Sequence, residues 1–202
     1  PSPEFDVAQA VGLMVTQPVD AYFPAVGPGH MAQVAGGAFQ QGLTPLSMMA
    51  APSFNDAFVR EGFALAPLFN SGSMYLMAFV GPYEMETPGH ATMRGTFQAM
   101  GIDSANTFLV AGWASQHHLK GVLEAAAKGG DLTRAGIRRA AANVYVDSDG
   151  MMPTRELGQN RADAESFIAI PDGTIGSGVR LLAGNYVGPT AGSYDWESGP
   201  CS

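Results

Sequence analysis

The sequence at residues 103–142, DSANTFLVAGWASQHHLKGVLEAAAKGGDLTRAGIRRAAA, carries the clearest periodicity of the 202-residue chain. In its first part, apolar side chains recur at three- and four-residue steps, which is the spacing of one helix face. Lys128 is followed by Gly129 and Gly130, a combination that is typical of a helix end, and a second helical pattern comes next. The stretch therefore predicts two helices joined at the glycine pair. The expected apolar face of the first helix consists of Leu109, Gly112, Trp113, Gln116, Leu119, Val122, Leu123 and Ala126.

Polar residues at both helix starts complete this pattern. Ser104 or Asn106 is expected to cap the first helix, because a side-chain oxygen there accepts from unpaired backbone N–H groups. Asp131 or Thr133 is expected to cap the second helix in the same way. A helix with a single apolar stripe needs a surface against which to bury it. The first helix is therefore expected to pack on another part of a larger fold.

The composition is that of a globular protein with one large or two small domains. Hydrophobic residues make up 46% of the chain, which is enough to fill a core. The formal net charge is -8 with ten Lys and Arg residues, which argues against a nucleic-acid partner because phosphate contacts need clustered cations. No apolar run approaches the roughly 20 residues that span a bilayer, so the chain is not expected to be membrane-spanning. Cys201 is the single cysteine and has no partner for an internal disulfide.

The first hundred residues alternate between strand-like and helical patterns. The expected strands are 20–26, 46–50 and 74–80, and the expected helices are 5–16, 31–42, a short one from Phe54, and 87–100 with Thr87 as its cap and Pro88 at its first position. Apolar strands that alternate with helices predict an α/β fold with a parallel sheet flanked by helices. Ligands bind beyond the carboxyl ends of the strands in such sheets. The loops of interest are therefore 26–30, 50–54 and 81–84.

The last quarter of the chain changes in character. Residues 166–170 and 179–184 are expected to be strands, with a tight turn at 171–173 between them. They are expected to add to the sheet in antiparallel fashion. Residues 189–202 are rich in Gly, Ser and Pro, which favours an irregular tail.

Motifs that carry chemistry are incomplete in this sequence. His117 and His118 are adjacent, so they point about 100° apart on a helix and differ from the i, i+4 pair that binds zinc. Residues 147–150 begin like a calcium loop, but Gly158 stands where a bidentate Glu is required, so a plain turn is expected. No nucleophile, base and orienting group come from neighbouring segments. The sequence therefore predicts no catalysis, no metal and no cofactor.

The order of these segments resembles a known protein family. The quoted pieces are VGPGHMAQVAGGAFQQGL (26–43), APSFND (51–56), GPY (81–83), AGWASQHHLKGVLEAA (111–126) and GGDLTRAGIRRA (129–140), followed by a returning segment that contains DG. In this order they resemble the type I periplasmic binding proteins, specifically the branched-chain amino acid and amide group that serves ABC transporters. The resemblance covers nearly the whole chain and corresponds to the carboxy-terminal half of such a protein. Its most specific part is the GW-containing helix with the hinge and the helix that follow.

The resemblance implies a two-lobed protein in which each lobe is an α/β sandwich and the lobes close on a solute about a hinge. Residues 1–102 would form the α/β segment of the second lobe. Residues 103–153 would supply a helix pair to the first lobe, and 154–188 would return as strands to the second lobe. Residues 189–202 would form the irregular tail.

The resemblance also implies where a solute would bind. In family members that bind amino acids, the second lobe supplies an aromatic side chain and a carboxylate that holds the ammonium group. Here Gly27 and Pro28 stand in the aromatic place and Ala51 stands near the carboxylate place. Because a buried ammonium without a carboxylate is costly, a standard α-amino acid in that pose is disfavoured. The candidate solute-binding residues are Gly27, Pro28, His30, Ala51, Ser53, Phe54, Tyr83 and Trp113.

This mixture of side chains suits a small polar or aromatic solute, such as an amino acid, an amide or a related compound. Trp113 has an equally good alternative role, which is to pack its helix onto a sheet. The expected function is that of the extracytoplasmic solute-binding component of an ABC transporter, periplasmic or lipid-anchored at the cell surface. Its expected partners are the small-molecule solute and a membrane permease. Two alternatives stay open, a ligand-sensing receptor or regulator of the same fold and an α/β enzyme without a recognisable motif.

The resemblance makes one structural expectation about the helix pair. If the sheet of the first lobe is largely absent from this chain, the face through Leu109, Trp113, Leu119 and Val122 should be poorly covered, or covered by another copy or chain.

Overall fold

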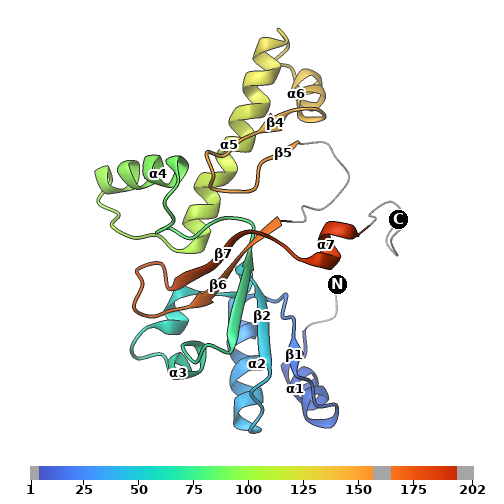
Figure 1. Ribbon diagram of the computed structural model, residues 1–202, viewed down its shortest axis with the longest axis vertical. Coiled ribbons are helices and arrows are strands. Elements are labelled where there is room, and N and C mark those ends of the chain that lie inside the picture. Colours follow the sequence, from blue (N-terminus) through green and yellow to red (C-terminus); the bar gives the residue numbers. More distant parts are fainter. Residues whose placement is uncertain (1–4, 157–164, 195–202) are drawn as a thin grey trace. The chain divides into compact units, whose positions relative to one another are not determined.

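The computed structural model describes residues 5–156 and 165–194 of the chain (Figure 1). These residues form two compact units. Unit 1 contains the residues up to Ala78 together with Ile168–Leu182, and unit 2 contains Phe79–Phe167 and the residues from Ala183 onward. The sequence analysis drew its first boundary between residues 102 and 103 instead. The assignment of these segments to lobes of a larger protein remains a prediction.

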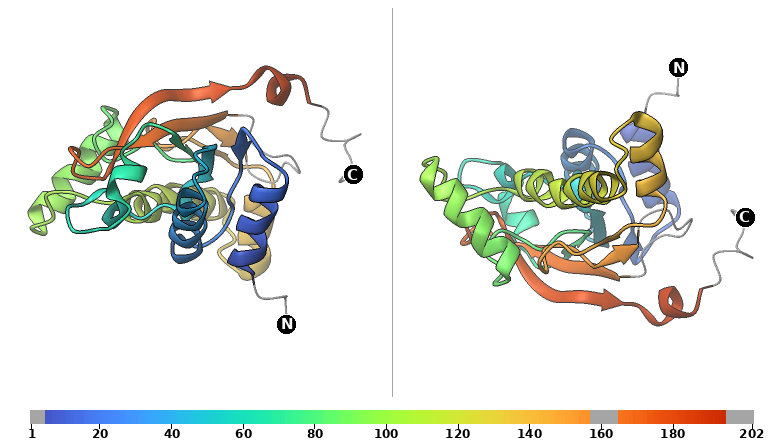
Figure 2. Two further views of the ribbon diagram at one scale, coloured as in Figure 1. Left: turned by 90° about the horizontal axis from the view of Figure 1, so that it is seen from below. Right: turned by 90° about the horizontal axis from the view of Figure 1, so that it is seen from above.

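A five-stranded sheet with the order β1-β2-β3-β6-β7 organises unit 1. The strands are β1 (Ala21–Tyr22), β2 (Leu46–Ala50), β3 (Met74–Ala78), β6 (Glu165–Pro171) and β7 (Val179–Val187). The first three strands pair in parallel, which confirms the predicted α/β fold. β6 and β7 lie side by side (Figure 2), and residues 172–178 between them are too few for a parallel crossover, so they form an antiparallel hairpin.

Helices cover this sheet as the apolar spacing predicts. α2 (Pro28–Gln40) places Met31 and Ala35 in a core that also contains Met49 of β2 and Leu76 of β3. α1 (Val7–Thr16) packs along α2 and has no buried residue of its own. Between β2 and β3 the chain forms two short 3-10 helices, η1 (Ala51–Ser53) and η2 (Asp56–Val59), and the one-turn α-helix α3 (Ala66–Phe69).

Two polar side chains hold the hairpin turn between β6 and β7. The Arg60 guanidinium donates to the carbonyls of Gly173, Ile175 and Gly176, at 3.3 Å for Gly173 and 3.1 Å for Ile175. The Asn70 side chain accepts from the N–H of Gly173 at 2.8 Å. Because carbonyls in a turn lack strand partners, these bonds fix a segment that the sheet itself cannot hold.

Unit 2 consists mainly of helices. They are α4 (Pro88–Ala99), α5 (Thr107–Lys128), α6 (Arg134–Ala141) and the short α7 (Pro189–Ser193), with a two-residue ladder between β4 (Tyr145–Val146) and β5 (Arg155–Glu156). Thr87 caps α4 and Pro88 opens it, as predicted. Of the two pairs of possible caps in the helix pair, Asn106 caps α5 and Thr133 caps α6. Asp131 instead accepts from the N–H and hydroxyl of Thr133, and these bonds lower the pKa of its carboxyl.

Several predicted boundaries are wrong. The strand expected at 20–26 ends at Tyr22, because Pro24 has no N–H to donate to a neighbouring strand. The short helix expected from Phe54 is the 3-10 helix η2, which starts at Asp56 with Asn55 as its cap. The turn expected at 171–173 runs through 172–178. The tail expected to be irregular from 189 begins with α7, and Cys201 lies outside the described residues.

The predicted apolar face of α5 is divided in the structure. Leu109 is 49% exposed and Leu119 is 54% exposed, as expected for a face without a partner. Val122 is 8% exposed, which contradicts the expectation, and Trp113 is half-buried. The difference arises because the buried side of α5 runs through Val110, Ala114, Val122 and Ala126 and leaves Leu109 and Leu119 outside it.

Candidate functional site

Ser53 ties together two strand-end loops of unit 1. Its hydroxyl accepts from the N–H of Val26 at 3.3 Å and donates to the carbonyl of Pro24 at 3.2 Å. The same carbonyl accepts from the N–H of Ala50 at 3.4 Å. The segment after β1 and the segment after β2 therefore meet at a side chain that is 1% exposed. This is where the sequence analysis expected two of its three loops.

The other predicted residues of unit 1 fall into two groups, one buried and one at the surface. Ala51 and Phe54 are 3% and 2% exposed, so both lie inside the protein. Phe54 belongs to the core of unit 1 and supports the loop from below. Gly27 and His30 are exposed, and Pro28 is half-buried. Only this second group offers surface to a solute in the described conformation.

The start of α2 has free backbone N–H groups of the kind that bind anions at helix N-termini. Gly27 occupies the N-cap position and makes no side-chain cap, because it has no side chain, and Pro28 opens the helix. The N–H groups of the first turn therefore lack a side-chain acceptor, and such groups favour an anion. His30 lies in this turn with its ring 5.4 Å from that of Phe5, edge to face. The turn combines exposed N–H groups with an aromatic pair.

Tyr83 and Trp113 belong to unit 2, where both pack on Phe97. The Tyr83 ring stacks at 6.5 Å from the Phe97 ring, and the Trp113 ring meets Phe97 edge to face at 5.6 Å. Tyr83 is 5% exposed. Within the described residues its hydroxyl is one of two buried side-chain polar atoms without a hydrogen-bond partner, the other being the Ser47 hydroxyl. A buried donor without an acceptor is destabilising.

Arg94 fixes the loop that carries Tyr83. Its guanidinium donates to the carbonyls of Tyr83 and Met85, at 2.9 and 2.8 Å, and forms an ion pair with Glu86 at 3.0 Å. The side chain is 19% exposed, so it lies mostly beneath the loop. The backbone at Tyr83 is therefore held from below by a charged group.

His90 fixes the other end of the same loop. Its Nε2 donates to the carbonyl of Gly81 at 3.3 Å, and its Nδ1 therefore accepts from the Thr87 hydroxyl at 2.8 Å. Burial lowers the pKa of the imidazole, and this effect exceeds that of the Gly81 carbonyl, which raises it. His90 is thus a neutral structural residue that bridges two ends of a turn.

Metal-ligating side chains do not cluster within the described residues. Residues 5–156 and 165–194 contain no group of three or more His, Cys, Asp or Glu that could hold a metal ion. His117 and His118 lie half-buried on α5, and residues 147–150 form a turn in which Asp147 accepts from the N–H of Asp149 at 2.8 Å. No helix within the same ranges is both long enough and apolar enough to cross a membrane.

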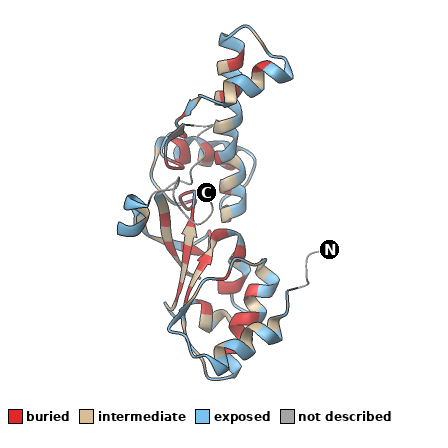
Figure 3. Cartoon of the chain, turned by 90° about the vertical axis from the view of Figure 1, so that its right-hand side faces the viewer, coloured by how far each residue is buried: buried red, intermediate tan, exposed pale blue. Residues whose placement is uncertain are grey.

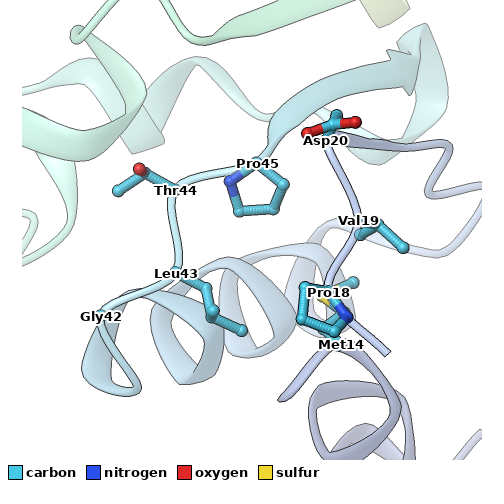
Figure 4. Close-up of a pocket in the computed structure, with 8 residues that line it drawn as sticks. All are labelled: Met14, Pro18, Val19, Asp20, Gly42, Leu43, Thr44 and Pro45. Carbon is cyan, nitrogen blue, oxygen red and sulfur yellow. The ribbon is translucent and has the colours of Figure 1, made fainter. Parts of the chain in front are cut away.

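A hollow of about 280 Å³ lies at the amino-terminal ends of β1 and β2 (Figure 4). Its lining residues are Met14, Pro18, Val19, Asp20, Gly42, Leu43, Thr44 and Pro45. Because all of them precede β1 or β2 along the chain, this hollow lies at the end of the strands opposite to the loops joined by Ser53. It is not the site that the strand-end rule predicts.

Phe23 is a candidate that the sequence analysis missed. It follows β1 directly and is 68% exposed, which is unusual for an aromatic residue in a loop beside a core. The sequence could have indicated this exposed position, because Phe23 directly precedes Pro24, which ends a strand. It was overlooked because the run 20–26 was interpreted as one continuous buried strand.

The sequence matches no protein-family model and no curated protein. Solved structures, in contrast, share its fold. A fatty acid ABC transporter substrate-binding protein from Thermomonospora curvata is 19% identical, with a TM-score of 0.80 over 95% of this chain and 49% of that one. A branched-chain amino acid ABC transporter protein from Thermus thermophilus with bound valine is 13% identical, with a TM-score of 0.63 over 94% and 52% of the two chains.

A leucine-binding protein from Thermotoga maritima is also 13% identical, with a TM-score of 0.63 over 93% of this chain and 50% of that one. The chain spans about half the length of these structures. It therefore has the fold of about half of a type I periplasmic binding protein. The predicted match to the carboxy-terminal half stays a prediction.

Proposed function

We propose that the chain is part of the solute-binding component of an ABC transporter. The observation that carries the proposal is the fold match over 95% of the chain to a substrate-binding protein, at a TM-score of 0.80. In this role the protein acts outside the cytoplasm, binds a small molecule between two lobes, closes about a hinge and docks on a membrane permease. It releases the solute chemically unchanged.

The loops of unit 1 favour a solute that carries an acceptor group rather than one that depends on a buried ammonium. The first turn of α2 presents backbone N–H groups and His30, which suit a carboxylate or an amide oxygen. In the loop after β2, the family resemblance puts Ala51 near the position where a carboxylate would bind an ammonium group. An aromatic or aliphatic acid or amide therefore suits these loops better than a standard α-amino acid.

In unit 2, Tyr83 is a separate candidate for contact with a solute. Its hydroxyl has no acceptor in the described structure, and Arg94 holds its backbone in place. A solute oxygen that reaches this hydroxyl would satisfy it. Trp113 packs on the same aromatic neighbour and would contribute to the shape of that region rather than a hydrogen bond.

A thermal-shift screen of the natural polypeptide that carries these 202 residues tests the proposal. Leucine represents the α-amino acids, benzoate and benzamide the aromatic acids and amides, and octanoate the aliphatic acids. Stabilisation that saturates with concentration identifies a bound solute. We expect benzoate, benzamide or octanoate to stabilise the protein more than leucine. If leucine stabilises it most, the inference from the loop around Ala51 is wrong.

Tyr83→Phe distinguishes a solute-binding tyrosine from a packing tyrosine. We expect the variant to bind the solute several-fold more weakly while its unliganded stability stays the same or rises, because the hydroxyl has no partner to lose. Tyr145→Phe is the matched control, since Tyr145 is 69% exposed and lies in the same unit. Equal solute affinity in both variants would exclude Tyr83 from the site.

A further inference from the structure

The chain contains two Asp–Gly dipeptides, and both lie in turns. Asp149–Gly150 belongs to unit 2 and Asp172–Gly173 to unit 1. The link between aspartate and glycine is especially open to rearrangement, because glycine has no side chain that hinders attack of its backbone nitrogen on the neighbouring carboxyl group. The two dipeptides have the same chemistry, so their surroundings decide which of them reacts.

Both reacting groups of the first dipeptide are free within the described residues. The N–H of Gly150 donates to no acceptor there, and the carboxyl group of Asp149 has no hydrogen bond or ion pair. Both residues are exposed, whereas Ser148 and Met151 on either side are 1% and 0% exposed. Figure 3 shows the burial of the chain in colour. The turn therefore presents the dipeptide to water between two buried neighbours.

The reacting groups of the second dipeptide are both held. The N–H of Gly173 donates to the side chain of Asn70 at 2.8 Å. One carboxyl oxygen of Asp172 accepts from the N–H and hydroxyl of Thr174 at 3.0 and 2.6 Å, and the other forms an ion pair with Arg180 at 3.1 Å. The bonds from Thr174, followed by the ion pair, lower the pKa of the Asp172 carboxyl. The two groups cannot approach each other without losing these contacts.

We infer that Asp149–Gly150 is a modification site at which the folded chain forms a succinimide and then isoaspartate, and that the fold protects Asp172–Gly173. In the first step the Gly150 nitrogen bonds to Cγ of Asp149, and the hydroxyl of the protonated carboxyl group leaves with the amide proton as water. In the second step water opens the ring. Opening at Cγ restores aspartate, whereas opening at the main-chain carbonyl gives isoaspartate. One water is released and one is consumed, so no other reactant is needed.

The modification changes the backbone where the turn is joined to the rest of unit 2. The carbonyl of Asp149 accepts from the N–H of Gly89 in α4, and the carbonyl of Met151 accepts from the N–H of Gly81, both at 3.0 Å. In isoaspartate the first of these carbonyls becomes a free carboxylate outside the main chain, and the turn gains one methylene carbon. The two bonds cannot both keep their present geometry. Isoaspartate at position 149 should therefore weaken the attachment of the turn to α4.

Ageing of the natural polypeptide that carries these 202 residues tests the inference without any solute. The folded protein is kept for weeks at mildly acidic pH, and electron-transfer mass spectrometry measures isoaspartate at both dipeptides. Conversion at Asp149 should be several-fold faster than at Asp172. In urea the two rates should become more similar, because unfolding removes the bonds that hold Asp172 and Gly173. Equal conversion in the folded protein, or none at Asp149, would overturn the inference.

Two variants test the protection and the consequence separately. Asn70→Ala removes the acceptor of the Gly173 N–H, so conversion at Asp172 should rise several-fold while conversion at Asp149 stays unchanged. Asp149→Glu keeps the carboxylate but lengthens the side chain by one carbon, so the five-membered ring cannot form. Ageing should lower the melting temperature of the parent but not that of Asp149→Glu. An equal fall in both proteins would contradict a role for isoaspartate at position 149.

Discussion

The substitution Ser53→Ala tests how the strand-end loops of unit 1 are held together. It removes the acceptor of the Val26 N–H and the donor to the Pro24 carbonyl. The carbonyl keeps its bond from Ala50, whereas the Val26 N–H loses its partner in a half-buried position. One partly buried donor without a partner costs about 1–2 kcal/mol. For a chain of this length that corresponds to a fall in Tm of roughly 2–8 °C.

Urea unfolding followed by circular dichroism measures this loss, and Ser71→Ala is the matched control. Ser71 is exposed and bonds only within its own turn, to Ser73, so its substitution should change the free energy of unfolding by less than about 0.5 kcal/mol. Amide exchange at Val26 should also become faster in Ser53→Ala. If the two serine variants have the same stability and the Val26 amide is unchanged, Ser53 does not join the loops.

Three further predictions concern groups that hold the two units in shape. His90→Gln should flatten the pH dependence of stability measured by urea unfolding, because burial lowers the pKa of His90 below its ordinary value of 6.5. The unfolded chain then binds a proton that the folded chain does not, so the parent loses stability as the pH falls through 6.5 and keeps it above. Gly89→Ala should lower the free energy of unfolding by about 1–3 kcal/mol in thermal melts, because its Cβ would lie 2.5 Å from Met151. Gly95 on the same helix has open space around it, so Gly95→Ala should raise the free energy of unfolding by about 0.5–1 kcal/mol. Equal shifts for both glycine variants would contradict this packing. Arg60→Lys keeps the charge but cannot reach three carbonyls, so amide exchange across 172–178 should accelerate, and an unchanged rate would show that the hairpin holds itself.

The sequence was sufficient where a local signal and a tertiary requirement agreed. The strand 46–50 was predicted to the residue because its apolar run is bounded by Pro45 and Pro52. The start of α4 was predicted from Thr87 and Pro88, whose roles depend on backbone groups of the same turn. In both cases neighbouring residues contain the information that determines the structure.

The candidate site was less predictable because its contacts join residues distant in the sequence. Ser53 was selected for its place in a loop, and nothing in the sequence shows that its hydroxyl reaches Pro24. The run 20–26 has the apolar content of a strand, but the strand ends at Tyr22 because Pro24 has no N–H for the ladder. The hydrogen bond from Arg94 to the carbonyl of Tyr83 could not be predicted for the same reason.

The face of α5 shows the limit of periodicity. The pattern through Leu109 and Leu119 describes an apolar side, yet the neighbours present in unit 2 cover the side through Val110 and Ala114. Periodicity reports which positions of a helix share a face. It does not report which of two apolar sides a given neighbour covers.

Calorimetric titration of the natural polypeptide, with mass spectrometry of the recovered solute, distinguishes solute binding from catalysis. The solute is the compound that gives the largest thermal shift. We expect one saturable binding event per molecule, weakened in Tyr83→Phe, and recovery of the solute unchanged after prolonged incubation. Conversion of the solute to a product would contradict a solute-binding role, as would the absence of heat for every compound in the panel.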